Sequence, residues 1–110
     1  MKVHGLSHCG TTKAAIADLR ENGHSPDLRD VRTEPLSREE LTQWMSILGD
    51  KLLNRASLTW RGLDPAEQQK DPIDLILAHD ALMKRPVIVD GDKVTMGWTA
   101  NVKRAWGVPV

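Results

Sequence analysis

A strand, a helix and a second strand fit within the first 31 residues, and this order most narrows the folds open to the chain. Residues 1–6 (MKVHGL) form a short apolar segment that is typical of a buried strand. In residues 12–22 the apolar side chains recur at helical spacing, and Gly23 follows where a helix usually ends. Residues 27–31 predict a second strand. A unit of this length has the size of a right-handed parallel βαβ unit.

The middle of the chain has the pattern of several helices. Ser37 and Glu40 in PLSREELTQWMSILG form a capping-box pattern, and the apolar residues that follow predict a helix ending at Gly49. Residues 51–69 indicate short helical pieces and turns. The Asp-Pro pair at 71–72 then predicts a helix over residues 73–83.

Near the C-terminus, the spacing of the apolar residues changes from that of helices to that of strands. Residues 87–89 and 94–96 are β-rich runs around Asp90-Gly91, which is a strong hairpin-turn signal, and a last helix is expected at 99–106. The order βαβ, helices, ββα is the plan of an α/β, thioredoxin-like fold, with a mixed four-stranded sheet and helices on both faces. We therefore expect a single domain over residues 1–110 with a helical insertion at about 36–84.

Composition narrows the partners that the chain is expected to have. Its 110 residues are 40% hydrophobic and 27% charged, as in an ordinary soluble domain. Lys plus Arg and Asp plus Glu both equal 15, so net charge gives no reason to expect nucleic acid or an anionic membrane. The single cysteine fits a reducing compartment, and no apolar run resembles a signal peptide or a membrane span. We expect a cytoplasmic monomer.

That cysteine, Cys9, lies between the first strand and the first helix. The N–H groups near Thr11 to Lys13 and the helix dipole would both favour the thiolate, which is the attacking form of a cysteine. Gly10 would leave room for a second sulfur or an oxyanion, and the hydroxyls of Thr11 and Thr12 can donate to the same anion. The alternative is that Cys9 is a small buried apolar residue.

A second clue is Arg85-Pro86, directly before the third predicted strand. In a thioredoxin-like sheet a proline at this place is typically cis and packs against the active-site loop. Arg85 would then lie close to Cys9, lower its pKa, and hold a carboxylate or an oxyanion. Otherwise Arg85 is a surface residue at a helix end. The scattered histidines show no metal-ligand spacing, so we expect no metal.

Five segments, in order and at matching spacing, resemble one family. They are HCGTTKAA at 8–15, LSREELTQWMSILG at 36–49, LLNRASLTWRGL at 52–63, LMKRPVIV at 82–89 and MGW at 96–98. The chain is similar to the ArsC/Spx superfamily of arsenate reductase-like proteins, and especially to its short YffB-like members. The resemblance implies a thioredoxin-like fold with a helical insertion, a redox-active Cys9, and Arg85-Pro86 as the family's Arg-Pro pair with a cis bond.

The chain departs from two branches of that family. Arsenate reductases use three arginines around the cysteine, but only Arg85 matches, with Asn54 and Trp98 at the other two positions. One cation is a poor clamp for a multiply charged oxyanion, which disfavours arsenate reduction. Spx-type regulators usually carry a Cys-x-x-Cys switch, which cannot close where Thr12 occupies the second position. YffB-like proteins have one cysteine and are thought to act as glutathione-dependent thiol reductases.

This comparison leads to a mechanistic hypothesis. The Cys9 thiolate attacks an oxidised thiol substrate, and glutathione, a co-substrate rather than a bound cofactor, resolves the mixed disulfide. Arg85 would hold a glutathione carboxylate, with Lys13 beside the anionic site. The strand edge beside Pro86 would pair with the tripeptide backbone, and Asn54, Arg55 and Arg61 would be rim contacts. A non-catalytic Spx-like adaptor and an arsenate reductase are the alternatives.

Overall fold

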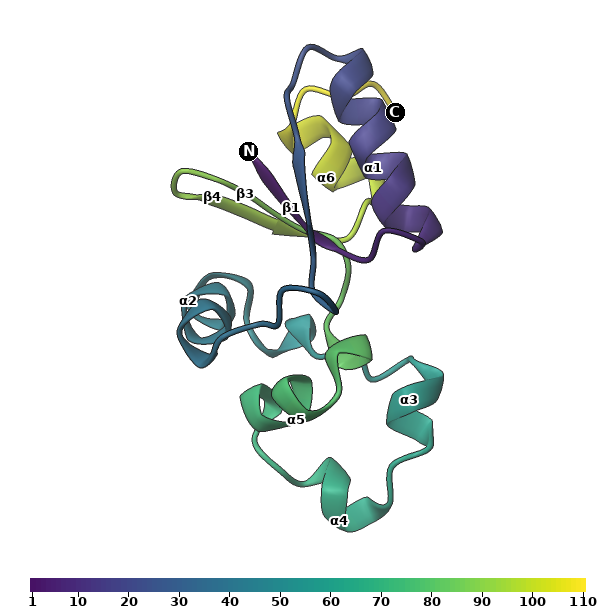
Figure 1. The fold of residues 1–110 in the computed structure, drawn as a ribbon, viewed down its shortest axis with the longest axis vertical. Helices are drawn as coiled ribbons and strands as arrows, with labels where there is room; N and C mark the ends of the chain where they lie inside the picture. Colours follow the sequence, from purple (N-terminus) through teal and green to yellow (C-terminus); the bar gives the residue numbers. More distant parts are fainter. The chain divides into compact units, whose positions relative to one another are not determined.

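The computed structural model describes residues 1–110, and the chain divides into two compact units (Figure 1). The first unit combines Met1–Glu34 with Arg85–Val110, and the second is the intervening segment Pro35–Lys84. No helix in either unit combines the length and the apolar character that crossing a lipid bilayer requires. The expectation of a single domain over the whole chain stays a prediction.

The first unit is built on a mixed sheet of four strands in the order β2-β1-β3-β4. The central strand β1 (Lys2–Gly5) pairs in parallel with β2 (Asp27–Asp30) and antiparallel with β3 (Val87–Asp90). Strand β3 also pairs antiparallel with β4 (Lys93–Met96). The predicted α/β fold with a mixed four-stranded sheet is confirmed.

Helices α1 (Gly10–Glu21) and α6 (Ala100–Ala105) share one hydrophobic core with this sheet. Figure 1 shows the two helices in the same part of the first unit. Val3 and Ile88 are directly paired across β1 and β3, and both belong to the same buried cluster. The other buried members of the cluster come from α1 and from the end of the chain: Ala15, Leu19, Trp106 and Val108. Burial of these apolar side chains fixes the start of α1 against the end of β1.

The second unit consists of short helices, as the sequence predicted. They are α2 (Arg38–Leu48), η1 (Asp50–Leu52), α3 (Leu58–Arg61), α4 (Pro65–Gln68), α5 (Pro72–Ala78) and η2 (Asp80–Leu82). The predicted capping box is present at α2. The Glu40 N–H donates to Ser37 Oγ at 3.1 Å, and the Ser37 N–H donates to Glu40 Oε1 at 3.0 Å.

The prediction of one continuous helix over residues 73–83 is wrong. Helix α5 ends at Ala78, because His79 adopts φ −139° and ψ 89°, and a 3₁₀ turn follows. The next segment instead pairs with residues 52–54: Asn54 N donates to Leu82 O at 2.7 Å, and Lys84 N donates to Leu52 O at 2.8 Å. A helix through Met83 would break this pairing, so tertiary contacts override the local helical pattern.

The predicted hairpin is present, but its turn lies one residue later than expected. Asp90 pairs with Lys93, so the two loop residues are Gly91 and Asp92 rather than Asp90 and Gly91. Gly91 has φ +60° at the first loop position, where glycine is the favoured residue.

Gly5, the last residue of β1, lies against Thr12 of α1, and this close approach generates a stability prediction. A Cβ added at Gly5 would lie 2.4 Å from Thr12 Oγ1 and 2.8 Å from its Cγ2. We expect Gly5→Ala to lower the free energy of unfolding by about 1–3 kcal/mol, as overpacking typically does. Urea denaturation measures this change. Gly10→Ala is the control, because a Cβ at Gly10 meets nothing within 4 Å; equal stability of the two variants would contradict the prediction.

Candidate active site

Cys9 is the N-cap residue of α1, in the loop that follows β1. Its backbone is extended, with φ −77° and ψ 123°, and its carbonyl accepts the first helical hydrogen bond, from Lys13 N at 3.0 Å. The Cys9 N–H donates to Leu6 O, also at 3.0 Å, which closes the turn from the strand. The side chain is half-buried, so the sulfur lies at the helix start and stays within reach of solvent.

The surroundings of Cys9 lower the pKa of its thiol from 9.0 to about 7. Burial makes the largest single contribution and raises the pKa, because a thiolate is less well solvated in the protein. Hydrogen bonds outweigh it. They come from the side chain and backbone N–H of Thr12, from the Arg85 guanidinium, and from the backbone N–H of Thr11. The thiolate is therefore more populated at neutral pH than it is in a free cysteine.

Thr12 holds its hydroxyl in a fully buried position against Gly5. In the resting thiol its Oγ1 has no hydrogen-bond partner of regular geometry. A buried hydroxyl without a partner is uncommon, because it loses its bonds to water and gains none in return. The Cys9 thiolate would supply the missing acceptor, and this is the sense in which Thr12 lowers the pKa.

Arg85 and Pro86 lie directly before β3 in the chain. The Arg85–Pro86 peptide bond is cis, as the resemblance predicted, and Pro86 is buried. The Arg85 guanidinium hydrogen-bonds the Cys9 side chain, so the structure brings Cys9 and Arg85 together. Strand β3 is paired on both sides, and Pro86 O accepts from Gly97 N at 2.9 Å. A peptide therefore cannot add along Val87–Asp90, and the expected backbone pairing is limited to the segment before Val87.

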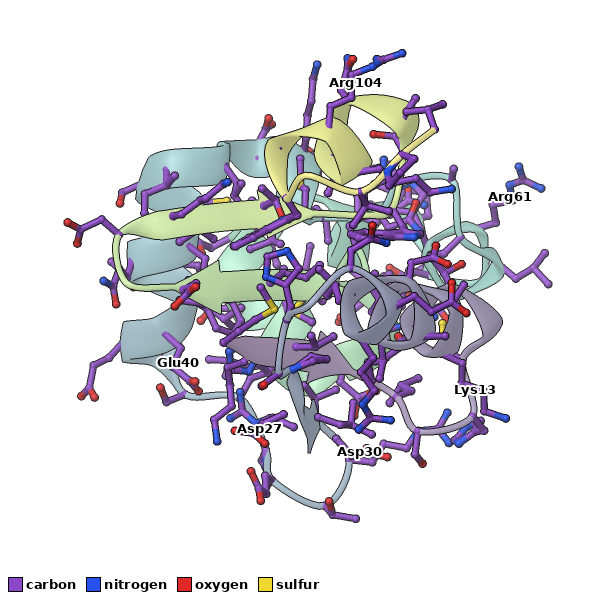
Figure 2. The ribbon with its side chains drawn as sticks, turned by 90° about the horizontal axis from the view of Figure 1, so that it is seen from above. Lys13, Asp27, Asp30, Glu40, Arg61 and Arg104 are labelled. Carbon is purple, nitrogen blue, oxygen red and sulfur yellow. The ribbon has the colours of Figure 1, made fainter.

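Three other candidates surround the helix start. Gly10 is exposed and faces open space, which leaves the approach to the backbone free. Thr11 is exposed, and its backbone N–H rather than its hydroxyl acts on the sulfur. Lys13 is exposed, and Figure 2 shows its side chain reaching out toward solvent.

The three expected rim residues belong to the second unit, where two of them have local side-chain partners. Asn54 Oδ1 accepts from the N–H of Ala56 at 3.1 Å, as in an Asx turn. Arg55 lies 5.5 Å from the centre of the Trp60 ring and 3.5 Å from Asp50 Oδ2. Arg61 is exposed, and its side chain points away from the ribbon in Figure 2. Their contact with glutathione stays a prediction.

Two residues near Cys9 were missed by the sequence reasoning. Gly5 has no side chain, so the Thr12 side chain can pack directly against its backbone. A glycine in a buried strand is a sequence signal of such a close approach. Asp30, at the end of β2, accepts a hydrogen bond from Ser7 N at 3.0 Å in the Cys9 loop. An aspartate at the end of a strand is a local turn signal, but its partner 23 residues away depends on strand pairing.

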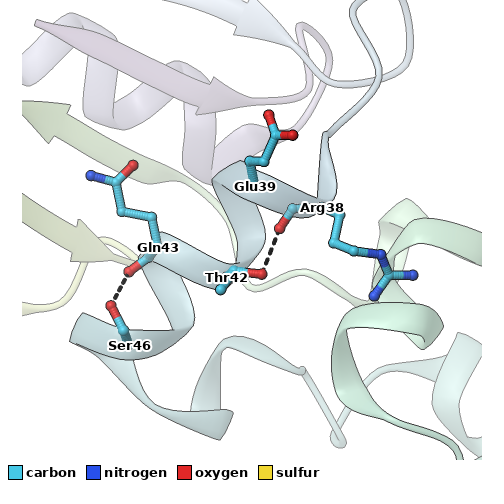
Figure 3. A pocket seen from close by; sticks show the side chains of 5 residues that line it. All are labelled: Arg38, Glu39, Thr42, Gln43 and Ser46. Atoms are coloured by element: carbon cyan, nitrogen blue, oxygen red, sulfur yellow. Dashed lines mark hydrogen bonds between the residues drawn. The ribbon is translucent and has the colours of Figure 1, made fainter.

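In the second unit, a concave surface lies on α2. It is lined by Arg38, Glu39, Thr42, Gln43 and Ser46 (Figure 3). Thr42 Oγ1 donates to Arg38 O at 2.8 Å and Ser46 Oγ donates to Gln43 O at 2.6 Å, so these hydroxyls serve their own helix. No group of three or more histidine, cysteine or acidic residues is placed to hold a metal ion.

A four-stranded mixed sheet with a cysteine at the start of its first helix and a cis-proline before its third strand defines a thioredoxin-like protein. The profile of the ArsC family matches residues 4–105, and the chain belongs to that family. The chain is 34% identical to an uncharacterised protein of Haemophilus influenzae, over 94% of this chain and 95% of the relative. The solved structure of a YffB protein superposes with a TM-score of 0.87 at 31% identity, covering 94% of this chain and 96% of the other.

Relatives with named functions fall into two groups. The chain is 29% identical to the global transcriptional regulator Spx of Streptococcus pyogenes, over 89% of this chain and 78% of that protein. It is 28% identical to an arsenate reductase of Rhizobium meliloti, over 74% of this chain and 62% of the reductase. The family thus includes both reductases and regulators.

The buried Thr12 hydroxyl generates a prediction for Cys9 reactivity. We expect Thr12→Val, which keeps the shape and the backbone N–H, to raise the pKa of Cys9 by about one unit. The rate of alkylation by iodoacetamide at pH 7 would then fall about fivefold. Thr11→Val is the matched control, because the Thr11 side chain contributes no bond to the sulfur. An unchanged pH profile in Thr12→Val would show that the hydroxyl does not stabilise the thiolate.

Proton linkage gives a prediction for stability against pH. The folded pKa of Cys9, about 7, lies below its ordinary 9.0, so between these values the unfolded chain binds more protons. Stability relative to Cys9→Ser should rise as pH increases from 7 to 9 and stay level above 9. Because Cys9 is partly exposed, we expect a gain of about 1 kcal/mol rather than the full linkage value. Parallel urea titrations of both proteins at several pH values measure it, and a flat difference would rule it out.

Proposed function

We propose that the protein is a glutathione-dependent thiol-disulfide reductase in which the Cys9 thiolate is the nucleophile. The observation that carries this proposal is the convergence of three kinds of donor on one solvent-reachable sulfur. These are the Thr12 hydroxyl, the Arg85 guanidinium and the N–H groups of Thr11 and Thr12. Such an arrangement serves an anion, whereas a purely structural cysteine needs no donors.

The proposed reaction has two exchange steps. In the first, the Cys9 thiolate attacks the glutathione sulfur of a substrate disulfide, so that the substrate leaves as a thiolate and Cys9 carries glutathione in a mixed disulfide. In the second, the thiolate of another glutathione attacks the glutathione sulfur of that mixed disulfide. Oxidised glutathione leaves and the Cys9 thiolate is restored. Across the two steps, one reduced glutathione is consumed, the substrate leaves as its thiol, and the oxidised glutathione joins the incoming glutathione to the one that the substrate carried.

The absence of a resolving cysteine supports an external thiol. Cys9 is the only cysteine of the chain, and Thr12 occupies the position where a Cys-x-x-Cys pair would have its second sulfur. Glutathione carries two carboxylates, and a guanidinium suits a carboxylate because it can donate two parallel hydrogen bonds. Arg85 is the proposed carboxylate contact beside the sulfur, with Lys13 as a longer-range cation. In this proposal the protein is a cytoplasmic monomer.

Arsenate reduction is the second candidate, favoured by the arsenate reductases among the relatives. Arg85 is the one arginine that hydrogen-bonds Cys9, which suits a carboxylate better than a multiply charged oxyanion. Arsenate turnover that depended on Arg85 would establish this candidate.

The test is mass spectrometry after incubation with oxidised glutathione. We expect a single glutathione adduct on Cys9 that excess reduced glutathione removes, and none on Cys9→Ser. Arg85→Gln should form the adduct about tenfold more slowly at pH 7, because it loses a charged hydrogen bond to the sulfur and to the carboxylate. Arg20→Gln is the control, because Arg20 lies exposed in the last turn of α1.

A folded protein that forms no adduct would contradict the reductase and favour the regulatory, Spx-like alternative. Equal rates for the Arg85 and Arg20 variants would contradict the role given to Arg85. Circular dichroism of each variant establishes that the fold is retained.

A further inference from the structure

We infer that Asp30, at the end of β2, is a positioning residue that holds the Cys9 loop in the geometry that stabilises the thiolate. The inference rests on the proposed function only in taking Cys9 to react as a thiolate. Asp30 does not hydrogen-bond the sulfur; it acts through the backbone of the residues before it.

The Asp30 carboxylate joins two backbone segments. Its Oδ2 accepts from Ser7 N at 3.0 Å, and its Oδ1 accepts from Arg32 N at 2.9 Å. Ser7 is two residues before Cys9, so this bond fixes the loop between β1 and α1. The Asp30 main chain is also held, because Asp30 O accepts from Glu34 N at 2.9 Å. The carboxylate is therefore presented from a turn whose own backbone is bonded.

A second side chain of the same turn, Arg32, also contacts the loop. Arg32 Nη1 lies 2.7 Å from His8 Nε2, and His8 directly precedes Cys9. A guanidinium can only donate, so Nε2 accepts and the ring proton lies on Nδ1. Asp30, Arg32, Ser7 and His8 together form a clasp around the residues before Cys9. Within the clasp, the backbone of the loop is held by the hydrogen bond that Ser7 N donates to the Asp30 carboxylate. Removing that carboxylate would therefore release the loop backbone.

The Asp30 carboxylate stays charged over the range in which Cys9 titrates. The hydrogen bond from the Ser7 backbone, followed by that from the Arg32 backbone, lowers the pKa of Asp30 to about 2. Its carboxylate is thus ionised throughout. An exposed negative charge would by itself raise the pKa of Cys9 only slightly, because water and salt screen it. The neighbouring Arg32 guanidinium reduces that effect further. Loss of the loop geometry is the larger expected consequence of removing Asp30.

Charge and position predict opposite results, which makes the inference testable. If Asp30 acted only as a charge, removing it would lower the pKa of Cys9 and speed alkylation. If it positions the loop, Asp30→Ala should raise the pKa of Cys9 by about one unit and slow alkylation by iodoacetamide about fivefold at pH 7. Asp30→Asn, which keeps one acceptor oxygen, should give a smaller change in the same direction. A merely structural residue would change the melting temperature without moving this pH profile.

The experiment measures the alkylation rate against pH for the unaltered full chain and four variants. Asp27→Asn is the control: Asp27 begins the same strand, is exposed, and its carboxylate makes neither bond of the clasp (Figure 2). If Asp30→Ala does not fold, Asp30→Asn and Arg32→Ala carry the test, since each weakens one arm of the clasp. An unchanged or lowered pKa of Cys9 in the folded Asp30 variants would overturn the inference.

The outcome is separable from that of the proposed function, because alkylation requires no glutathione. A raised pKa in the Asp30 variants, together with no glutathione adduct on the unaltered protein, would support the clasp and contradict the reductase. An adduct on the unaltered protein with an unchanged alkylation profile in the variants would support the reductase and overturn the clasp.

Discussion

The site depends on a competition at one sulfur between burial and hydrogen bonding. Partial burial of Cys9 opposes ionisation, and it is the largest single influence on the thiol. Hydrogen bonds from Thr12, Arg85 and the Thr11 backbone outweigh it and lower the pKa of the thiol to about 7. One of these donors, the Thr12 hydroxyl, fits only because the adjacent strand residue is Gly5, which has no side chain. The need for a glycine at the end of β1 is thereby linked to the pKa of the cysteine at the start of α1.

The fold was largely predictable because its signals are local. Hydrophobic spacing indicated α1 and α2, the Ser37–Glu40 capping box gave the start of α2, and β-rich runs indicated the hairpin. The errors arose where distant pairing overrides local preference. The helix expected to reach Met83 stops at Ala78 because residues 82–84 bond to residues 52–54. The hairpin turn shifts by one residue because Asp90 pairs with Lys93.

The site was predictable in part. The position of Cys9 between strand and helix, and of Arg85-Pro86 before β3, follows from element order, and the structure brings Cys9, Thr12 and Arg85 together. Gly5 and Asp30 escaped notice because their partners are set by the packing of α1 and by the parallel pairing of β1 with β2. Asn54, Arg55 and Arg61 came from family resemblance and spacing alone. The side-chain bonds of Asn54 and Arg55 in the second unit are local, and the functional role of all three residues stays a prediction.

The central claim is that the folded protein holds Cys9 as a thiolate near neutral pH. Ultraviolet absorbance of the thiolate, titrated against pH and corrected with Cys9→Ser, measures this directly and without any reagent. The account predicts a single transition with a midpoint near 7. A midpoint at or above 9.0, the ordinary value for a free thiol, would contradict it.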